Sequence, residues 1–148
     1  MLFPKKVKHR KWQTGRKNPE KLARPATRGT TLAFGSFGIK AQSGARVRSN
    51  QIEAARRALA RSITKSGKVW IRIFPDRPYT QKAAEVGMGK GKGDLQGYVF
   101  EVKPGRMLFE VDGVPEAAAR EGLRKAGAKL PCKVRVVVFD DGRLKVAL

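Results

Sequence analysis

One amphipathic helix is predicted between residues 49 and 67, where apolar residues recur every three or four positions. Either Ser49 or Asn50 can cap its amino end, and Glu53, three residues after Asn50, can complete a capping box. Gly67 supplies a stop signal at the other end. The apolar stripe that would face the core consists of Ile52, Ala55, Leu59 and Ile63.

A second helix is predicted between Gly113 and Leu130. Pro115 suits its first turn because proline has a fixed backbone angle and needs no hydrogen-bond acceptor there. Glu116 follows near the positive end of the helix dipole. The apolar stripe of this helix is thin and consists of Ala119, Leu123, Ala126 and Leu130.

Strands are predicted where β-branched and aromatic residues alternate with other types. The first such segment contains Gly35 and Gly38 and indicates a bent or bulged pair of strands, whereas Pro75 ends the second segment. Pro104 and Gly105 are typical of the turn of a hairpin between the third and fourth segments. The segments are TLAFGSFGIKAQ (31–42), KVWIRIFPD (68–76), YVFEVKPG (98–105), RMLFEVDG (106–113) and KVRVVVF (133–139).

A last short hairpin can form where Asp141 and Gly142 precede residues 144–146. The elements then follow one another as strand, helix, strand, long loop, strand, strand, helix and strand. This order predicts a single α+β domain with a mostly antiparallel sheet and two helices. The expected organisation is a basic extension over residues 1–30, the domain over 31–139 and a tail over 140–148.

Residues 76–96 lack periodicity and are predicted to form a long basic loop, which contains the run GMGKGKGD (87–94). A phosphate-binding P-loop would need serine or threonine after the lysine, and the dinucleotide motif would need a following helix, so both fail on spacing. Glycines let the backbone approach a crowded surface while lysines supply positive charge. The alternative is a flexible surface loop without a function, but the position of the glycine-lysine run within this basic stretch favours a functional loop.

Positive charge is distributed unevenly along the chain. The 148 residues carry a formal net charge of +21, and residues 1–93 hold nearly all of that excess. Residues 1–31 contain ten basic groups, one acidic group and few large apolar residues, so this segment cannot build a core alone. It is expected to be extended or disordered when free and to fold on RNA, with a solvated tail as the alternative. This excess of positive charge predicts a polyanionic partner.

The composition argues against catalysis, and no cofactor or metal is expected. Cys132 and His9 are the only cysteine and histidine, which excludes a zinc finger and makes a Ser-His-Asp or Cys-His site improbable. Carboxylates in the basic two thirds are too scattered to hold a catalytic metal. Membrane association is disfavoured because the cationic helix has a narrow apolar face. The remaining alternative is a general nucleic-acid-condensing protein.

Four basic residues of the first predicted helix, Arg56, Arg57, Arg61 and Lys65, are interpreted as a phosphate-contacting face. The strand that follows is expected to bury Trp70 and Phe74 while Arg72 contacts RNA. Cys132, beside Pro131 at the start of a strand, is expected to be an inert buried thiol.

Several motifs resemble the bacterial and organellar large-subunit ribosomal protein sixteen, the universal uL-sixteen family. QIEAARRALAR and the run from FPDRP to MGKGKG are the most specific, and the likeness extends over most of residues 1–139. Many relatives carry an arginine where this chain has Gly87, so that contact is not carried over. The matching stretches are MLFPKKVKHRK (1–11), FGSFGIKA (34–41), QIEAARRALAR (51–61), GKVWIRIFPDRP (67–78), EVGMGKGKG (85–93), EVKPGRMLFEVDGVPE (101–116) and AGAKLP (126–131).

The resemblance implies an α/β-hammerhead type of fold, binding to large-subunit rRNA, a role in late subunit assembly and a position beside the A-site tRNA. Residues 76–93 would then reach toward the peptidyl-transferase centre. The implied partners are rRNA, A-site tRNA (with P-site tRNA as an extension) and neighbouring ribosomal proteins. Since the family-like start begins at Met1, the expected location is the ribosome in a bacterial cytoplasm, or in an organelle that encodes the protein.

Two sets of residues are expected to carry this function, without any catalytic residue. The rRNA-binding set is Lys5, Lys6, Lys8, Arg10, Lys11, Arg16, Lys17, Arg56, Arg57, Arg61, Lys65 and Arg72. The set near tRNA and the peptidyl-transferase centre is Arg77, Lys82, Met88, Gly89, Lys90, Gly91, Lys92 and Gly93.

Overall fold

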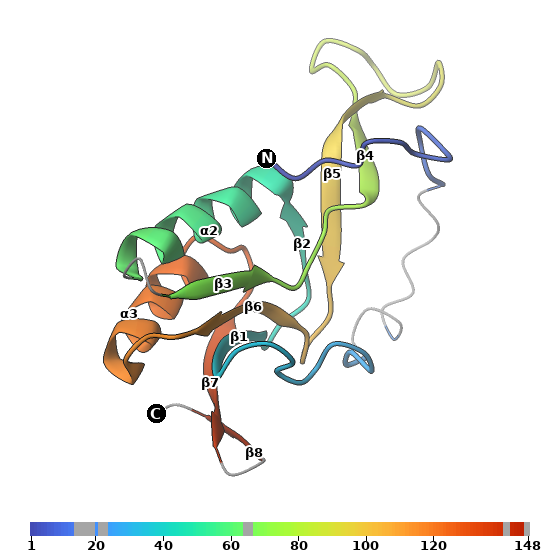
Figure 1. Ribbon diagram of the computed structural model, residues 1–148. Coiled ribbons are helices and arrows are strands. Elements are labelled where there is room, and N and C mark those ends of the chain that lie inside the picture. The colour runs from blue at the N-terminus through green and yellow to red at the C-terminus, as the bar shows by residue number, and fades with distance from the viewer. Residues whose placement is uncertain (14–19, 21–23, 64–66, 141–142, 147–148) are drawn as a thin grey trace.

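A computed structural model describes residues 1–13, 20, 24–63, 67–140 and 143–146, which form a single α+β domain (Figure 1). One sheet has the strand order β3-β6-β1-β7-β8 and the other has the order β2-β5-β4, and every pair is antiparallel. The expected fold class is confirmed. The elements are β1 (Phe37–Ala41), β2 (Ala45–Arg48), α2 (Ser49–Ser62), β3 (Lys68–Ile71), β4 (Arg77–Gln81), β5 (Asp94–Val102), β6 (Met107–Asp112), α3 (Glu116–Gly127), β7 (Val134–Asp140) and β8 (Arg143–Val146).

The core lies between the two helices and the five-stranded sheet. Helices α2 and α3 pack against each other and lie on the same side of that sheet (Figure 1). The side chains of Leu59, Leu123 and Phe109 meet there and are fully buried. Burying a side chain of this kind contributes about 1.5–3 kcal/mol. The apolar spacing in the sequence therefore identified the inward faces of both helices correctly.

The start of α2 differs in detail from the capping prediction. Arg48 is the N-cap residue, and its backbone N–H donates to the Gln51 side chain at 2.9 Å. Glu53 is not part of a cap, because it pairs with arginines in the next turn. The helix ends at Ser62 rather than near Gly67, since Ile63 adopts an extended backbone and returns to the core.

The predicted hairpin at residues 98–113 is wrong, because β5 and β6 belong to different sheets. Pro104 and Gly105 do form a turn, in which the Arg106 N–H donates to the Lys103 carbonyl at 3.2 Å. Gly105 has φ +90°, a conformation that glycine adopts without strain. Its N–H donates to the Ala41 carbonyl at 2.7 Å. This turn passes the chain from one sheet to the other.

Residues 76–96 are more ordered than the sequence predicts. Strand β4 lies entirely inside this range, and β5 begins inside it at Asp94. The two strands pair from Arg77 opposite Val99 to Gln81 opposite Asp94. Pro78 and a register irregularity after Tyr79 interrupt the alternation that would have revealed β4. The connection without strands is therefore limited to residues 82–93, called the β4–β5 loop below.

Three other local expectations can be compared with the structure. Phe74 is 43% exposed, so its predicted core position is wrong, whereas Trp70 is half-buried and Cys132 is buried. Helix α3 has Pro115 as its N-cap rather than in its first turn. Strands β7 and β8 pair as expected, while their predicted turn, Asp141-Gly142, lies outside the described residues.

The first thirteen residues, called the N-terminal arm below, have no regular secondary structure and run beside β4 and β5 (Figure 1). Leu2 packs against the core. The ring of Phe3 contacts that of Tyr98 edge-on, with 6.1 Å between centroids. Further along, the Ala26 N–H donates to the Pro104 carbonyl at 2.8 Å. Folding of this region on RNA stays a prediction.

Candidate RNA-binding surface

A cluster of ion pairs among Glu53, Arg56 and Arg57 lies on the basic face of α2. Glu53 accepts from Arg56 Nη2 at 2.7 Å and from Arg57 Nε at 3.0 Å. These two hydrogen bonds lower the pKa of Glu53 from 4.5 to about 2, so the carboxylate stays charged. Arg61 has no ion-pair partner in the described part of the chain, and Lys65 lies outside that part. The cluster of three charges keeps one net positive charge and holds two guanidinium groups in fixed positions.

Replacing Glu53 with glutamine is expected to remove an acid-dependent part of the stability. A carboxylate with a lowered pKa stabilises the folded state above pH 4.5, and this contribution disappears as the pH falls toward about 2. The difference in urea midpoint between wild type and Glu53→Gln, followed by circular dichroism, should therefore be largest at neutral pH and shrink on acidification. A difference that is constant with pH would contradict this, and Glu85→Gln is the control for removing one negative charge.

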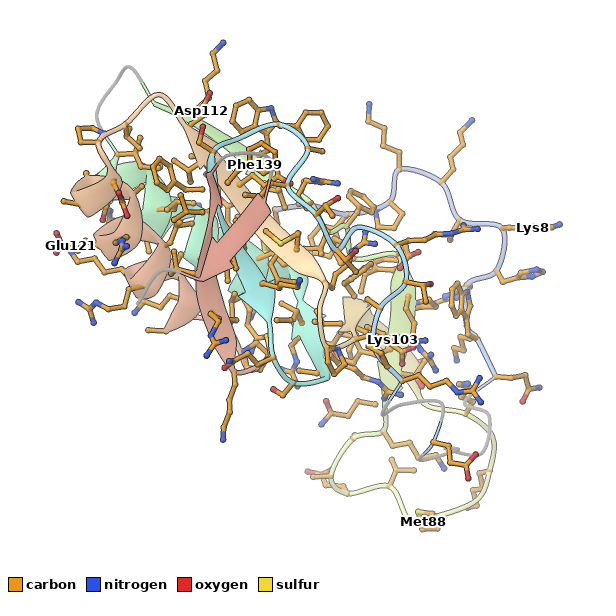
Figure 2. The ribbon with its side chains drawn as sticks, turned by 90° about the horizontal axis from the view of Figure 1, so that it is seen from below. Lys8, Met88, Lys103, Asp112, Glu121 and Phe139 are labelled. Carbon is orange, nitrogen blue, oxygen red and sulfur yellow. The ribbon has the colours of Figure 1, made fainter. Side chains whose placement is uncertain are left out.

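The N-terminal arm presents basic side chains to solvent. Lys5, Lys6, Lys8 and Arg10 are all exposed, and Lys8 points away from the body of the domain (Figure 2). Lys11 is different, because its Nζ lies 3.7 Å from an Asp94 carboxylate oxygen and donates to the Lys92 carbonyl at 3.4 Å. Within this predicted set the structure thus distinguishes four exposed groups from Lys11, which is held by contacts at the base of the loop. Arg16 and Lys17 lie outside the described residues.

The β4–β5 loop is held partly by its own lysines. Lys82 Nζ donates to the Gly89 carbonyl and, at 3.5 Å, to the Gly87 carbonyl. Met88 is fully exposed at the tip of the loop (Figure 2). Three consecutive residues there, Gly89, Lys90 and Gly91, have positive φ angles of 94°, 53° and 89°. The Lys90 side chain is exposed, so the loop offers one outward cation beside a stretch of open backbone.

The base of this loop contacts the N-terminal arm. Lys92 Nζ donates to the Trp12 carbonyl, and the Arg77 guanidinium lies over the Trp12 ring, 5.8 Å from its centroid. Arg77 also pairs with Glu101 at 2.8 Å. Arm and loop therefore form one surface at one end of the molecule. Sequence reasoning placed basic groups in both segments but missed their contact, because about eighty residues separate them.

Arg72 is expected to contact RNA, and in the structure its guanidinium also has a partner within the protein. Its side chain is largely buried and pairs with Glu110, whose side chain is completely buried. Glu110 also accepts from the backbone N–H groups of residues 33–35. A completely buried carboxylate needs a partner for its charge, and Arg72 supplies it. Contact of Arg72 with RNA stays a prediction. The signal available in the sequence was an acid inside the apolar strand MLFEVD.

Groups suited to other chemistry are sparse in the described ranges. No three histidine, cysteine, aspartate or glutamate side chains there gather as a metal ion would need. None of the helices in those ranges combines the length and apolar character needed to cross a membrane. Burial raises the pKa of the Cys132 thiol, so less of the reactive thiolate is present.

Comparison with known families agrees with this geometry. A family model described as ribosomal protein L16p/L10e matches residues 4–137. The matched range includes most of the arm, both helices and the entire β4–β5 loop.

Proposed function

Because the chain belongs to the ribosomal protein L16p/L10e family, we propose that its basic end supports late assembly of the large ribosomal subunit and lies beside the A-site tRNA. Family membership itself makes the chain a structural, rRNA-binding protein of the large subunit that takes part in translation. The proposal adds where on the surface these contacts are made. A bacterial rather than an organellar ribosome is also part of the proposal.

The observation that carries the proposal is the joint surface of the N-terminal arm and the β4–β5 loop. Its cations come from segments far apart in the sequence, and they are linked through the Lys11 and Lys92 contacts. A basic arm that is extended in the free protein gains order when phosphates neutralise it. The open glycine backbone at the loop tip suits close approach to a second RNA surface, such as tRNA.

The residues proposed for these contacts follow from this division. Arg72, which is paired with Glu110, stays a proposed rRNA contact in addition to those named below. Arg77 and Lys82 stay proposed tRNA contacts in addition to those named below, and they also hold the loop in place. The proposed tRNA-facing residues are Met88, Gly89, Lys90 and Gly91, with Lys92 and Gly93 at the neck of the loop. The proposed rRNA contacts in the described chain are Lys5, Lys6, Lys8, Arg10, Lys11, Arg56, Arg57 and Arg61, to which the sequence adds Arg16, Lys17 and Lys65.

Competition between nucleic acids tests the proposal against a general condensing protein. In a filter-binding assay at one salt concentration, the protein is expected to bind large-subunit rRNA more tightly than duplex DNA of equal length. Shape and single-stranded features distinguish structured RNA from a regular duplex, whereas charge alone does not. Equal affinity for both would support the condensing protein instead.

Replacing Gly93 with alanine is expected to disturb the loop and weaken tRNA binding. A Cβ at Gly93 would lie 2.6 Å from the carbonyl carbon of Gln81, a contact with backbone that side-chain rotation cannot relieve. Such overpacking costs about 1–3 kcal/mol and would spread the neck of the loop. Large subunits reconstituted with Gly93→Ala should bind A-site tRNA several-fold more weakly than those with wild-type protein.

Gly87→Ala is the matched control in the same loop. Nothing lies within 4 Å of a Cβ built at Gly87, and its φ angle is not positive, so alanine fits there without displacement. Subunits with Gly87→Ala should therefore bind A-site tRNA as the wild type does. If the two variants behaved alike, the neck geometry would have no part in the function.

A further inference from the structure

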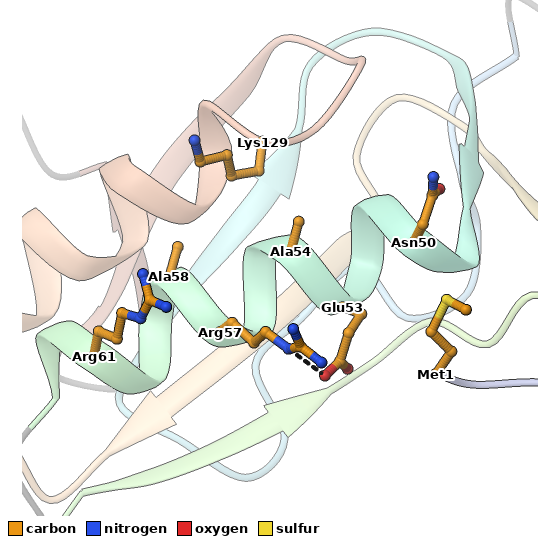
Figure 3. Close-up of a pocket in the computed structure, with 8 residues that line it drawn as sticks. All are labelled: Met1, Asn50, Glu53, Ala54, Arg57, Ala58, Arg61 and Lys129. Atoms are coloured by element: carbon orange, nitrogen blue, oxygen red, sulfur yellow. Dashed lines mark hydrogen bonds and ion pairs between the residues drawn. The ribbon is translucent and has the colours of Figure 1, made fainter.

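A groove runs between α2 and the end of α3. Two hollows of about 490 and 620 Å³ share Ala58, Arg61 and Lys129 in their linings and so form one continuous depression, called the interhelix groove below. Figure 3 shows the first hollow, with Ala54 and Ala58 on α2 and Lys129 just beyond α3. Asn50 and Met1 lie at its outer end.

The floor of the interhelix groove is made of small side chains. Ala54 and Ala58 line it from α2, while Ala118 and Ala128 line it from α3 and the residue that follows. Methyl groups leave the helices accessible to a ligand that comes close to their surface. Among the described residues that line the groove, none is aromatic and only Met1 is large and apolar, whereas protein interfaces are usually anchored by buried aromatic or large apolar residues.

The walls of the groove carry more positive than negative charge, and pairing leaves three cations available. Glu53 is engaged by arginines of its own helix, and Glu121 pairs with Lys125 at 2.7 Å. Within the described ranges no ion pair involves Arg61, Arg124 or Lys129. These three groups come from both sides of the groove, so an anion between them would be contacted by both helical segments.

We infer that the interhelix groove binds the phosphodiester backbone of one rRNA strand, with Arg61 on one side and Arg124 and Lys129 on the other. An elongated cationic groove with a methyl floor matches a chain of phosphates, and arginine can bind each phosphate through two N–H groups. This inference rests on the proposed rRNA-binding function and extends it to α3, to which sequence analysis assigned no RNA contact. Apart from Met1, which belongs to the N-terminal arm, the residues that line this site lie outside the surface made by the arm and the loop.

The test measures how rRNA binding depends on salt in a variant of the α3 side alone. Each lost phosphate contact reduces the slope of log affinity against log salt by about 0.7–0.9 units, so Arg124→Gln with Lys129→Gln should flatten it by about 1.4–1.8 units. Both residues are exposed, and circular dichroism will verify that the variant keeps its fold. The matched control is Lys103→Gln with Lys133→Gln, which removes two exposed cations outside the groove.

Each outcome is decisive. A flatter slope in the groove variant, with the control pair close to wild type, supports the inference. An unchanged slope in the groove variant, or an equal loss in the control pair, overturns it and leaves rRNA binding intact. A variant that binds free rRNA normally but is lost from assembled subunits would also overturn it, because the groove would then contact a protein. Failure of the wild type to bind large-subunit rRNA would refute the proposed function itself.

Discussion

Replacing Glu110 with alanine is expected to destabilise the folded protein by about 3–5 kcal/mol, the usual cost of breaking a buried ion pair from one side. The carboxylate is completely buried and holds the Arg72 guanidinium. One of its oxygens also accepts from the Phe34 N–H at 2.7 Å and from those of Ala33 and Gly35 at 3.1 Å. Alanine would leave one charge and three backbone donors without a partner.

Urea unfolding followed by circular dichroism measures this loss. Glu116→Ala is the control, because Glu116 is exposed and its pair with Arg120 crosses one turn of α3. Exposed pairs contribute at most about 1 kcal/mol, so this control should stay close to wild type. If Glu110→Ala were as stable as Glu116→Ala, the buried network would not be a determinant of the fold.

Neutralising four cations of the N-terminal arm is expected to give the largest change in rRNA binding. With Lys5, Lys6, Lys8 and Arg10 changed to glutamine, the slope of log affinity against log salt should flatten by about 2.8–3.6 units. All four side chains are exposed, so each can reach a phosphate without breaking a contact within the domain. A filter-binding titration from low to high salt gives the slope directly.

A second set of four exposed cations provides the control for net charge. Glutamine at Lys68, Lys103, Lys133 and Arg135 removes the same charge from strands and turns of the domain. This variant should retain most of the wild-type slope if the arm makes specific contacts. Equal flattening in both variants would indicate that only total charge matters, as in a condensing protein.

Local patterns in the sequence predicted what depends on neighbouring residues. The spacing of Ile52, Ala55 and Leu59 predicted the buried face of α2, and that face is buried. The turn at Pro104-Gly105 was also predicted correctly, but its strands were assigned to one hairpin. Turn chemistry determines where the chain reverses, whereas the choice of partner strand depends on long-range packing that a local pattern does not contain.

The candidate site shows the same limit. Basic composition predicted the arm, the α2 face and the β4–β5 loop, because charge excess is visible without any fold. It could not reveal which cations are already paired. Arg72 is paired with Glu110 across 38 residues of sequence, and Lys92 is fixed against Trp12 across 80. Tertiary contacts therefore decide which positive groups are available to RNA.

Because the turn at Pro104-Gly105 passes the chain from one sheet to the other, it also limits which fragments of the protein could fold on their own. Strands β1 and β6 pair in one sheet while β2 and β5 pair in the other, so the consecutive strands β1 and β2, and likewise β5 and β6, belong to different sheets. No single cut in the gene would yield two halves that each keep a complete sheet. A peptide excised around the β4–β5 loop would lack β2, and split-protein or fragment approaches to this loop will need the intact polypeptide.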